Sequence, residues 1–287
     1  MNTSDVARSA VLVEAEELAA LLAGGVAPVL LDVRWALGRT DGHEQYLAGH
    51  LPGAVYVDLE TELAASATPV DGRHPLPDVA SLEAAARRWG VRAGGTVVAY
   101  DATGGMSAAR AWWLLRWAGV PGVRLLDGGL AAWLSASGSL ETGAVTALAG
   151  DVVLVPGALA TLDADDAAEL ASSGVLLDAR AGERYRGEVE PVDPCAGHIA
   201  GAVSAPTSEN LDADGRFLGA EALQARFAAL GVPGAPRVGV YCGSGVTAAH
   251  EVAALASLGV EAALYPGSWS QWSADPDRAV TTGPDPR

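Results

Sequence analysis

The fold is decided by the stretch Val238-Gly239-Val240-Tyr241-Cys242-Gly243-Ser244-Gly245-Val246-Thr247-Ala248-Ala249-His250. Its first four residues form an apolar run, which predicts a buried strand. A cysteine follows the run, two glycines come within the next three residues, and an alanine-rich segment then predicts a helix. Cys242 therefore lies in a tight loop whose backbone N–H groups and helix N-terminus can stabilise an anion. Such a loop favours a nucleophilic thiolate, and a purely structural cysteine is the alternative.

The composition is that of an acidic globular chain. The 287 residues are 50% hydrophobic and carry a formal net charge of −17, and every one of the 18 basic residues is arginine. This length allows one large domain or two ordinary ones, and the hydrophobic content excludes disorder. A polyanion such as nucleic acid would be repelled. An anionic ligand must therefore be held locally, by a few arginines and backbone amides.

Cysteine usage and the N-terminus indicate where the protein works. Cys195 and Cys242 are the two cysteines, too few for a disulfide framework or a zinc-type ligand cluster. Residues Met1 to Arg8 lack the basic start and apolar core of a signal peptide, and no apolar run approaches membrane-spanning length. We therefore expect a cytoplasmic protein with no membrane partner and no metal.

The two halves of the chain repeat the same landmarks in the same order. The matched pairs are Leu30–Arg34 with Leu176–Arg180, Gly49–Ala54 with Gly197–Ala202, Val97–Asp101 with Val238–Cys242, and Asp127–Gly129 with Pro266–Ser268, the last pair being followed by Trp133 and Trp272. Four ordered matches indicate a duplicated domain rather than a solenoid. Asp101 stands where the second copy has Cys242. We interpret Asp101 as a helix-capping carboxylate, so the first copy lacks the nucleophile.

Within each half, strand-like and helix-like segments alternate. The expected strands include Val29–Val33, Thr96–Tyr100 and Val123–Leu126, and the expected helices include Leu82–Trp89, Ala108–Trp117 and Ala220–Leu230. This alternation predicts an α/β fold in which each copy is a parallel sheet flanked by helices. We place the domains at residues 1–142 and 157–287, with residues 143–156 as the linker. Ligands of such sheets bind beyond the carboxyl ends of the strands, where Cys242 lies.

These landmarks resemble the two-domain rhodanese-type sulfurtransferases over nearly the whole chain, from about Ala10 to Trp272. The resemblance implies tandem duplicated rhodanese-like domains, of which the C-terminal one is catalytic. The loop from Cys242 to Thr247 is most similar to the 3-mercaptopyruvate sulfurtransferase branch. Thiosulfate-preferring members carry basic residues inside this loop, where the present chain has Gly243 and Ser244.

The resemblance also implies the chemistry. The thiolate of Cys242 attacks the outer sulfur of 3-mercaptopyruvate or thiosulfate and becomes a persulfide, which passes its sulfur to cyanide, a thiol or a protein thiol such as thioredoxin. Such covalent catalysis in two half-reactions gives ping-pong kinetics. The loop amides, contributed by Gly243, Gly245, Val246 and Thr247, would stabilise the thiolate and the persulfide. No metal or organic cofactor is required.

Arg184 matches the family arginine that binds the donor's carboxylate or sulfonate. A guanidinium suits this task because its planar fork engages two oxygens at once. Mercaptopyruvate-type members often carry a second arginine just after the Glu-Pro that follows this motif, but Glu190-Pro191 is followed here by Val192. This departure predicts that thiosulfate is used comparably well or better.

Ser244 and His74 match a serine and a first-domain histidine that pass a proton in the mercaptopyruvate branch. Protonation of the departing pyruvate enolate is the task we expect of this pair, and an ordinary loop histidine is the alternative for His74. An acidic partner would fall near Asp58 or Glu60.

Several other polar residues have structural interpretations. His50 and His198 lie in repeated Gly-His turns, and duplication in a copy without a nucleophile favours a packing role for both. Arg34 and Arg180 each follow a strand aspartate, which favours ion pairs or turn anchors. Cys195 is interpreted as an incidental free thiol, with a disulfide to Cys242 as the alternative. Trp112, Trp113, Trp117 and Trp133 have the spacing of packed helix faces.

Three other kinds of protein share parts of this pattern. A dual-specificity phosphatase needs a Cys-x5-Arg loop, but Ala248 stands six residues after Cys242 and the loop contains no arginine. A non-enzymatic scaffold of rhodanese modules would fit the first copy but not the complete loop of the second. A sulfur carrier that delivers the persulfide to a partner protein would use the same residues as the enzyme.

Overall fold

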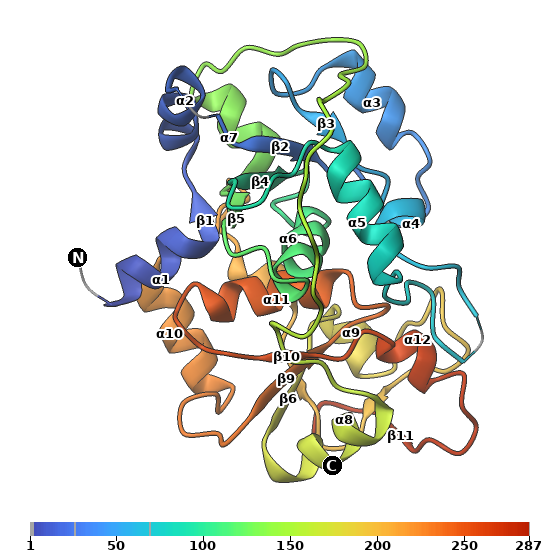
Figure 1. Cartoon of the computed structure of the whole chain (residues 1–287). Coiled ribbons are helices and arrows are strands. Elements are labelled where there is room, and N and C mark those ends of the chain that lie inside the picture. The colour runs from blue at the N-terminus through green and yellow to red at the C-terminus, as the bar shows by residue number, and fades with distance from the viewer. Residues whose placement is uncertain (1–2, 26, 69, 287) are drawn as a thin grey trace. The chain divides into compact units, whose positions relative to one another are not determined.

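The computed structural model describes residues 3–25, 27–68 and 70–286, which divide into two compact units (Figure 1). Unit 1 consists of Met1–Ala65, Pro77–Leu159 and Leu211–Phe217, and unit 2 of Ser66–Leu76, Ala160–Asn210 and Leu218–Arg287. Each half of the chain therefore contributes one short segment to the unit built mainly from the other half. Met1 and Asn2, which begin the segment without signal-peptide character, lie outside the described residues.

The sheet of unit 1 is parallel, and its strands follow the order β1-β5-β4-β2-β3. These strands are β1 (Leu12–Val13), β2 (Val29–Asp32), β3 (Val55–Tyr56), β4 (Val97–Tyr100) and β5 (Val123–Leu126). The helices are α1 (Thr3–Val11), α2 (Ala15–Ala23), α3 (Gly42–Ala48), α4 (Leu59–Glu62), α5 (Val79–Arg88), α6 (Ala108–Trp117) and α7 (Gly129–Ser135).

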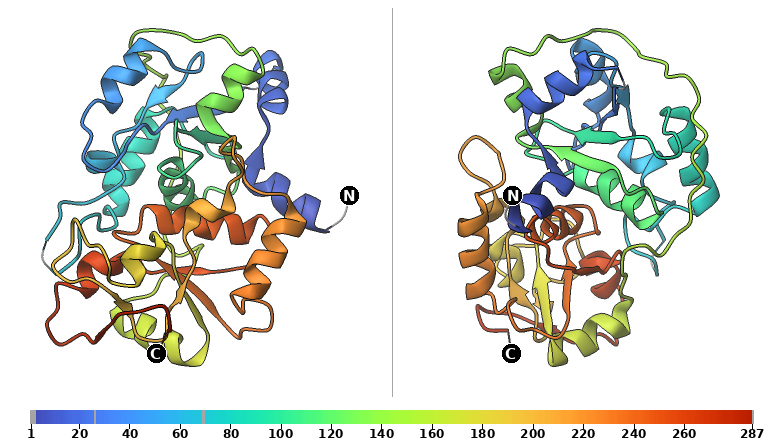
Figure 2. Two further views of the ribbon diagram at one scale, coloured as in Figure 1. Left: turned by 180° about the vertical axis from the view of Figure 1, so that it is seen from behind. Right: turned by 60° about the vertical axis from the view of Figure 1, so that its left-hand side comes forward.

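Unit 2 contains a parallel sheet in the order β10-β9-β6-β8 and an antiparallel pair, β11 with β7. The strands are β6 (Val175–Asp178), β7 (His198–Ile199), β8 (Val203–Ser204), β9 (Val238–Tyr241), β10 (Ala263–Leu264) and β11 (Val280–Thr281). The helices are α8 (Ala164–Ser173), α9 (Gly182–Tyr185), the 3-10 helix η1 (Thr207–Asn210), α10 (Ala220–Ala229), α11 (Thr247–Ala256) and α12 (Ser268–Trp272). In the right-hand view of Figure 2, α10 and α12 flank the parallel sheet on opposite sides.

The strand registers confirm the duplication. Asp32 at the end of β2 pairs with Tyr100 of β4, and Asp178 at the end of β6 pairs with Tyr241 of β9. Leu31 pairs with Val55 in the same way that Leu177 pairs with Val203. The predicted α/β architecture, with one parallel sheet in each copy, is therefore correct.

The helices begin where side chains satisfy the first free N–H groups. The carboxylate of Asp78 accepts the N–H of Ser81 over 3.0 Å, so α5 starts at Val79, three residues before the predicted Leu82. In α8, Asp163 and Asp166 form a reciprocal capping box. The predicted helix over Ala108–Trp117 has the same bounds as α6.

Buried ion pairs anchor equivalent turns in both units. The guanidinium of Arg34 binds the carboxylate of Asp32 and the carbonyl of Gly49, and that of Arg180 binds Asp178 and the carbonyl of Gly197. The expectation of structural ion pairs is confirmed. A buried charge is tolerated only when it is paired in this way.

The histidines of the Gly-His turns are also structural. Nδ1 of His50 lies 2.9 Å from the carbonyl oxygen of Tyr46, and Nδ1 of His198 lies 2.8 Å from that of Tyr185. Each imidazole stacks on the ring of the same tyrosine and is fully buried. Burial lowers the pKa of His198, because the charged form loses its solvation.

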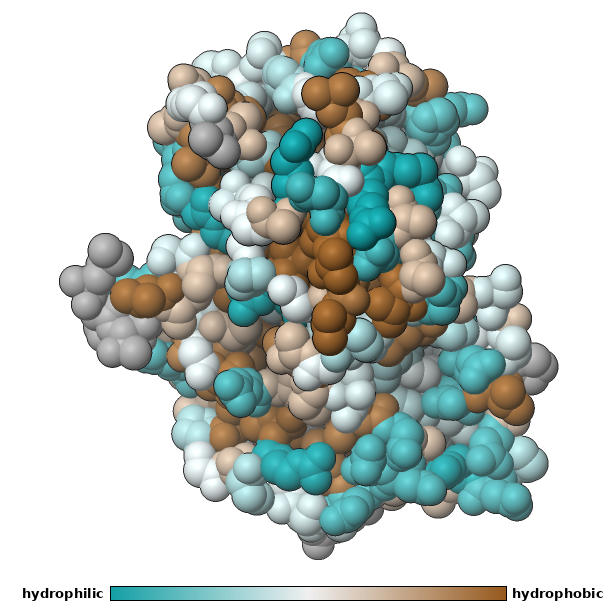
Figure 3. All heavy atoms as spheres, viewed as in Figure 1, coloured by the Kyte–Doolittle hydropathy of each residue, from teal (hydrophilic) through white to brown (hydrophobic). Residues whose placement is uncertain are grey.

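The segment after α7, residues 136–159, is part of unit 1. Glu141 pairs with His50, and the N–H of Gly150 donates to the carbonyl of Arg87 over 2.8 Å. The segment exposes the apolar residues Leu148, Val153 and Val155, and brown residues gather in Figure 3 on the face where it runs in Figure 1. Among the described residues, no helix combines the length and apolar character needed to cross a bilayer.

Candidate active site

Cys242 follows the last residue of β9 and is 1% exposed. The backbone N–H of Gly245 donates a hydrogen bond to Sγ of Cys242 over 3.2 Å. Gly245 has φ +75°, a left-handed conformation that allows the chain to turn back over the sulfur and enter α11 two residues later. The predicted strand, loop and helix are therefore all present, and the loop directs an amide at the sulfur.

The start of α12 fixes the orientation of this loop. The N–H of Trp269 donates to the carbonyl of Cys242 over 2.9 Å, and the N–H of Ser270 donates to the carbonyl of Gly243 over 2.9 Å. Because the carbonyl and N–H of a trans peptide point in opposite directions, the following amides face away from α12. The N–H of Cys242 in turn donates to Oγ of Ser268 over 3.1 Å.

Ser268 adopts φ +53°, which is uncommon for a residue with a side chain. The corresponding residue of unit 1, Gly129, has φ +55°. Ser268 therefore has a strained backbone, and in this conformation its hydroxyl oxygen accepts the hydrogen bond from the N–H of Cys242. Local strain of this kind is characteristic of functional sites.

Ser244 and His74, which sequence reasoning paired, meet in unit 2. Oγ of Ser244 lies 2.7 Å from Nδ1 of His74, and both residues are buried. His74 reaches this place because Ser66–Leu76 belongs to unit 2. The hydroxyl and the imidazole of this buried pair can each donate or accept a proton.

The same end of α12 also holds the segment that carries His74. The N–H of Arg73 donates to Oγ of Ser270 over 3.1 Å, and Nε2 of Gln271 donates to the carbonyl of Val70 over 2.7 Å. Gly72, with φ +85°, packs against Ser270 so closely that a Cβ at position 72 would lie 2.7 Å from its Oγ. The start of α12 therefore positions both the loop that carries Cys242 and the imidazole of His74.

Arg184, at the end of α9, lies beside the loop. Nη2 of Arg184 binds Glu190 over 2.6 Å and Asp193 over 3.0 Å, and its Nε binds Glu190 over 3.2 Å. A Cβ on Gly243 would lie 3.4 Å from Nη1 of Arg184. The predicted donor-binding arginine is therefore next to Gly243, the residue that follows Cys242.

Sequence reasoning missed two charged residues of this cluster, Arg73 and Asp193. Nη1 of Arg73 forms an ion pair with the buried carboxylate of Asp193, and burial raises the pKa of that carboxyl. A Cβ on Gly243 would lie 3.0 Å from Nη2 of Arg73. Their positions in the sequence could have indicated them, because Arg73 immediately precedes His74 and Asp193 follows Glu190-Pro191-Val192.

The other site residues predicted from the sequence lie in the loop, at the start of α11 or in unit 1. Gly243 and Val246 are buried in the loop, and Thr247 is the first residue of α11. Both cysteines are free thiols, Cys195 exposed and Cys242 buried. In unit 1 the carboxylate of Asp58 caps α4 by accepting the N–H of Thr61, and that of Glu60 accepts from Nε1 of Trp35 over 2.6 Å.

In unit 1 the equivalent loop encloses a carboxylate. Oδ1 of Asp101 accepts the N–H groups of Thr103 and Gly105, and Oδ2 accepts those of Ser107 and Ala108, all at 2.8–2.9 Å. The expectation that Asp101 is a capping carboxylate is confirmed. The anion that the loop stabilises in unit 1 belongs to the chain itself.

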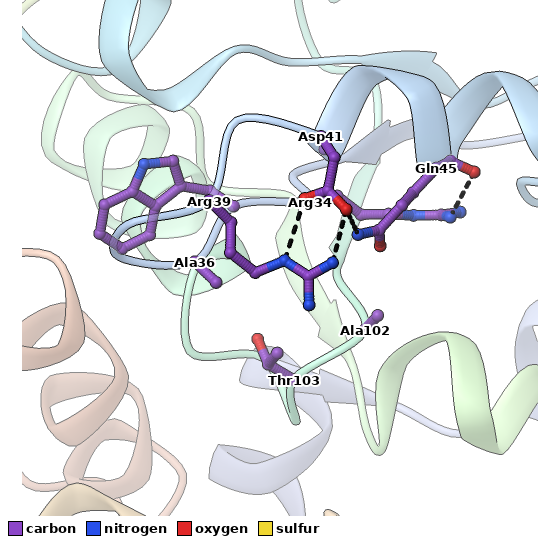
Figure 4. Close-up of a pocket in the computed structure, with 9 residues that line it drawn as sticks. Arg34, Ala36, Arg39, Asp41, Gln45, Ala102 and Thr103 are labelled. Atoms are coloured by element: carbon purple, nitrogen blue, oxygen red, sulfur yellow. Dashed lines mark hydrogen bonds and ion pairs between the residues drawn. The ribbon is translucent and has the colours of Figure 1, made fainter.

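A pocket of about 190 Å³ lies at the carboxyl ends of β2 and β4 in unit 1 (Figure 4). Its lining residues are Arg34, Trp35, Ala36, Arg39, Asp41, Gly42, Gln45, Ala102 and Thr103. The guanidinium of Arg39 reaches into it and binds the carboxylate of Asp41. Because Asp101 already accepts four amides of the adjoining loop, these amides offer no anion site to the pocket.

Comparison with known proteins gives a consistent result. The family profile described as "Rhodanese-like domain" matches residues 14–136 and 163–275. A protein of Mycobacterium tuberculosis, provisionally named thiosulfate sulfurtransferase SseB, is 52% identical over 282 residues, covering 96% of this chain and 99% of the relative. A protein of Pseudomonas aeruginosa, provisionally named 3-mercaptopyruvate sulfurtransferase, is 48% identical over 283 residues, with the same coverage of 96% and 99%.

A solved structure of the same family has a similar fold. The crystal structure of SseA from Escherichia coli, described as a 3-mercaptopyruvate sulfurtransferase of rhodanese fold, has a TM-score of 0.79 and 35% sequence identity. The match covers 90% of this chain and 98% of that one.

Proposed function

The chain belongs to the rhodanese-like family, and on that premise we propose that it is a sulfurtransferase whose nucleophile is Cys242. The sulfur donor is 3-mercaptopyruvate or thiosulfate, and the acceptor is cyanide or a thiol. The observation that carries the proposal is the hydrogen bond from the N–H of Gly245 to Sγ of Cys242, in a loop whose carbonyls are held by α12. A preorganised donor aimed at a sulfur anion stabilises both the thiolate and the persulfide.

The reaction proceeds in two half-reactions. The Cys242 thiolate attacks the outer sulfur of the donor, a sulfur–sulfur bond forms, and the donor's bond to that sulfur breaks. The electron pair of the broken bond leaves with sulfite, or with the enolate of pyruvate, which then takes up a proton. The acceptor next attacks the outer sulfur of the persulfide, and Cys242 returns to its thiolate form.

The neighbouring residues have separate tasks. The Ser244–His74 pair supplies the proton that the enolate needs, whereas sulfite leaves as a stable anion without one. The guanidinium of Arg184 binds the anionic head of the donor. The amides of Gly243, Val246 and Thr247 complete the environment of the sulfur.

Three broader features complete the proposal. The acceptor can be a protein thiol such as thioredoxin, because the persulfide carries its transferable sulfur on the outside. The protein acts in the cytoplasm, where two free thiols remain reduced. In chain order, the rhodanese-like domains occupy residues 1–142 and 157–287, joined by residues 143–156.

Replacement of Cys242 by serine tests the assignment. Cys242→Ser is expected to abolish turnover with either donor while the far-ultraviolet circular dichroism stays that of the wild type. Cys195→Ser is the matched control, because it removes the other, exposed thiol and is expected to leave turnover unchanged. Initial rates of the wild type at varied donor and acceptor should give parallel double-reciprocal lines. Full activity of Cys242→Ser would refute the proposal.

A further inference from the structure

Two guanidinium groups converge on the space above Gly243. A Cβ on this glycine would lie 3.0 Å from Nη2 of Arg73 and 3.4 Å from Nη1 of Arg184. Among the residues that the structure describes, neither of these two nitrogens has a hydrogen-bond acceptor, and the buried Nε of Arg73 has none either. Nη1 of Arg73 is bound by Asp193, and Nε and Nη2 of Arg184 are bound by Glu190 and Asp193. The two free edges therefore face the position next to the nucleophile.

Asp193 holds the two arginines together. Its carboxylate binds Nη1 of Arg73 and Nη2 of Arg184, and its side chain is 3% exposed. Glu190, also buried, binds the remaining side of Arg184. These carboxylates fix the guanidinium planes from behind, so the free nitrogens need little reorganisation to bind an anion.

A second cation beside Arg184 would strengthen the binding of the donor's anionic group. Both 3-mercaptopyruvate and thiosulfate carry an anionic group, a carboxylate or a sulfonate, close to the sulfur that is transferred. The loop after Cys242 supplies no positive side chain, since its next residues are Gly243 and Ser244. The segment Glu190-Pro191 supplies none either, because Val192 follows it. Arg73, which comes from Ser66–Leu76, lies where such a charge is missing.

We propose that Arg73 is the second donor-binding arginine, and that it grips the anionic head of the donor together with Arg184. The proposal rests on the sulfurtransferase function proposed above. The head group lies over Gly243, with oxygens that accept from Nη2 of Arg73 and Nη1 of Arg184. Gly243 has no side chain, and this absence leaves the space for the head group.

Ping-pong kinetics separate this role from a structural one. The kcat/KM for the donor reports only the first half-reaction, and the kcat/KM for a neutral thiol acceptor such as 2-mercaptoethanol reports only the second. Loss of a hydrogen bond to a charged group costs about 1.5–3 kcal/mol, or roughly 10- to 150-fold. Arg73→Ala is therefore expected to lower the kcat/KM for thiosulfate and 3-mercaptopyruvate by this factor and to leave that for 2-mercaptoethanol unchanged.

Two further variants sharpen the test. Arg73→Lys keeps the charge but not the fork and should recover part of the loss. Arg186→Ala is the matched control, since this arginine pairs with Glu188 at the surface and should behave as the wild type. An unchanged donor kcat/KM in Arg73→Ala, or an equal fall for donor and acceptor, would overturn the proposal.

Gly243→Ala provides an independent test in the same space. The added methyl group would meet Nη2 of Arg73 at 3.0 Å, so the guanidinium must move. We expect a several-fold loss of donor kcat/KM in the wild-type background and a smaller loss in the Arg73→Ala background, because the displaced group is then absent. An unchanged donor kcat/KM in Gly243→Ala would contradict a head-group site over Gly243.

Binding without turnover distinguishes this proposal from the proposed function. Calorimetry with 3-mercaptopropionate, which retains the thiol and a carboxylate, can be carried out on Cys242→Ser and on Cys242→Ser/Arg73→Ala. At least tenfold weaker binding to the double variant supports the head-group site, even for a protein that forms no persulfide. Equal affinities, or no binding to either protein, overturn it.

Discussion

The N–H of Gly245 donates a hydrogen bond to Sγ of Cys242 over 3.2 Å. In the matching loop of unit 1, the N–H of Gly105 donates to a carboxylate oxygen of Asp101 over 2.8 Å. The same strand, turn and helix thus surround a sulfur in one unit and a fixed carboxylate in the other.

Asp101 is expected to be a stabilising residue. In Asp101→Ala, four backbone N–H groups of the loop lose their acceptor at once. Buried donors left without partners cost about 1–3 kcal/mol each when no water replaces the lost acceptor, so a total loss of at least about 4 kcal/mol is expected. Urea unfolding followed by tryptophan fluorescence measures it.

The control for this variant is Asp78→Ala, which removes an exposed helix cap from α5 in the same unit. A loss of about 1 kcal/mol is expected there. A similar small loss for Asp101→Ala would mean that water replaces the carboxylate.

The Ser244–His74 pair should matter for one donor only. Ser244→Ala and His74→Asn remove the proton source for the pyruvate enolate, so kcat with 3-mercaptopyruvate should fall by about 10²-fold or more. Thiosulfate releases sulfite, which needs no proton, and its kcat should stay within a few-fold of the wild type. Steady-state rates with both donors at saturating acceptor give the comparison.

Equal losses with the two donors would assign the pair to a structural role. Wild-type rates of Ser244→Ala and His74→Asn with both donors would show that the pair takes no part in the reaction. In either case the assignment of Cys242 would stand, because it rests on the loop.

Glu251, on α11, is fully buried in unit 2. Its Oε2 accepts from Nδ2 of Asn210 over 2.5 Å, while its Oε1 has no partner among the described residues. Burial raises the pKa of Glu251 from 4.5 to about 7, because the charged form is poorly solvated. The native state therefore keeps a proton that the unfolded chain releases.

Protonation of Glu251 makes the stability of the native state depend on pH. Between pH 4.5 and about 7 the native state binds more protons at Glu251 than the unfolded state, so the stability contribution of this group falls as pH rises and is constant above pH 7. The decrease is on the order of 2–3 kcal/mol. Glu251→Gln, which stays neutral, should remove it and should be more stable than the wild type at pH 8.

Denaturant unfolding at pH 5 and pH 8 measures the effect. Glu221→Gln is the matched control, because Glu221 is an exposed carboxylate in the first turn of α10 in the same unit. A wild-type pH dependence that persists in Glu251→Gln would assign it to other groups.

The sheets and the nucleophile loop were predictable because their signals are local. Val238–Tyr241 is an apolar run that ends at a cysteine, and the glycine and alanine residues after it determine a turn and a helix. The duplicated Asp-x-Arg units gave the ion pairs for the same reason. Repetition of a local pattern strengthens each copy of it.

The assembly of the cluster around Gly243 was not predictable in this way. Arg73 and Asp193 are 120 residues apart, and both lie in loops without a hydrophobic period. Their ion pair depends on Ser66–Leu76 joining unit 2, which the turn at Gly72 and the hydrogen bond from the N–H of Arg73 to Oγ of Ser270 bring about. The burial of Glu251 could not be predicted from the sequence either, because a single carboxylate in an alanine-rich helix usually faces water.

The most direct measurement is the intact mass of the protein after separate exposure to 3-mercaptopyruvate and to thiosulfate under non-reducing conditions, followed by peptide mapping. We expect a gain of one sulfur atom, located on Cys242 and lost when a thiol acceptor is added. No gain from either donor, or a gain located on Cys195, would contradict it.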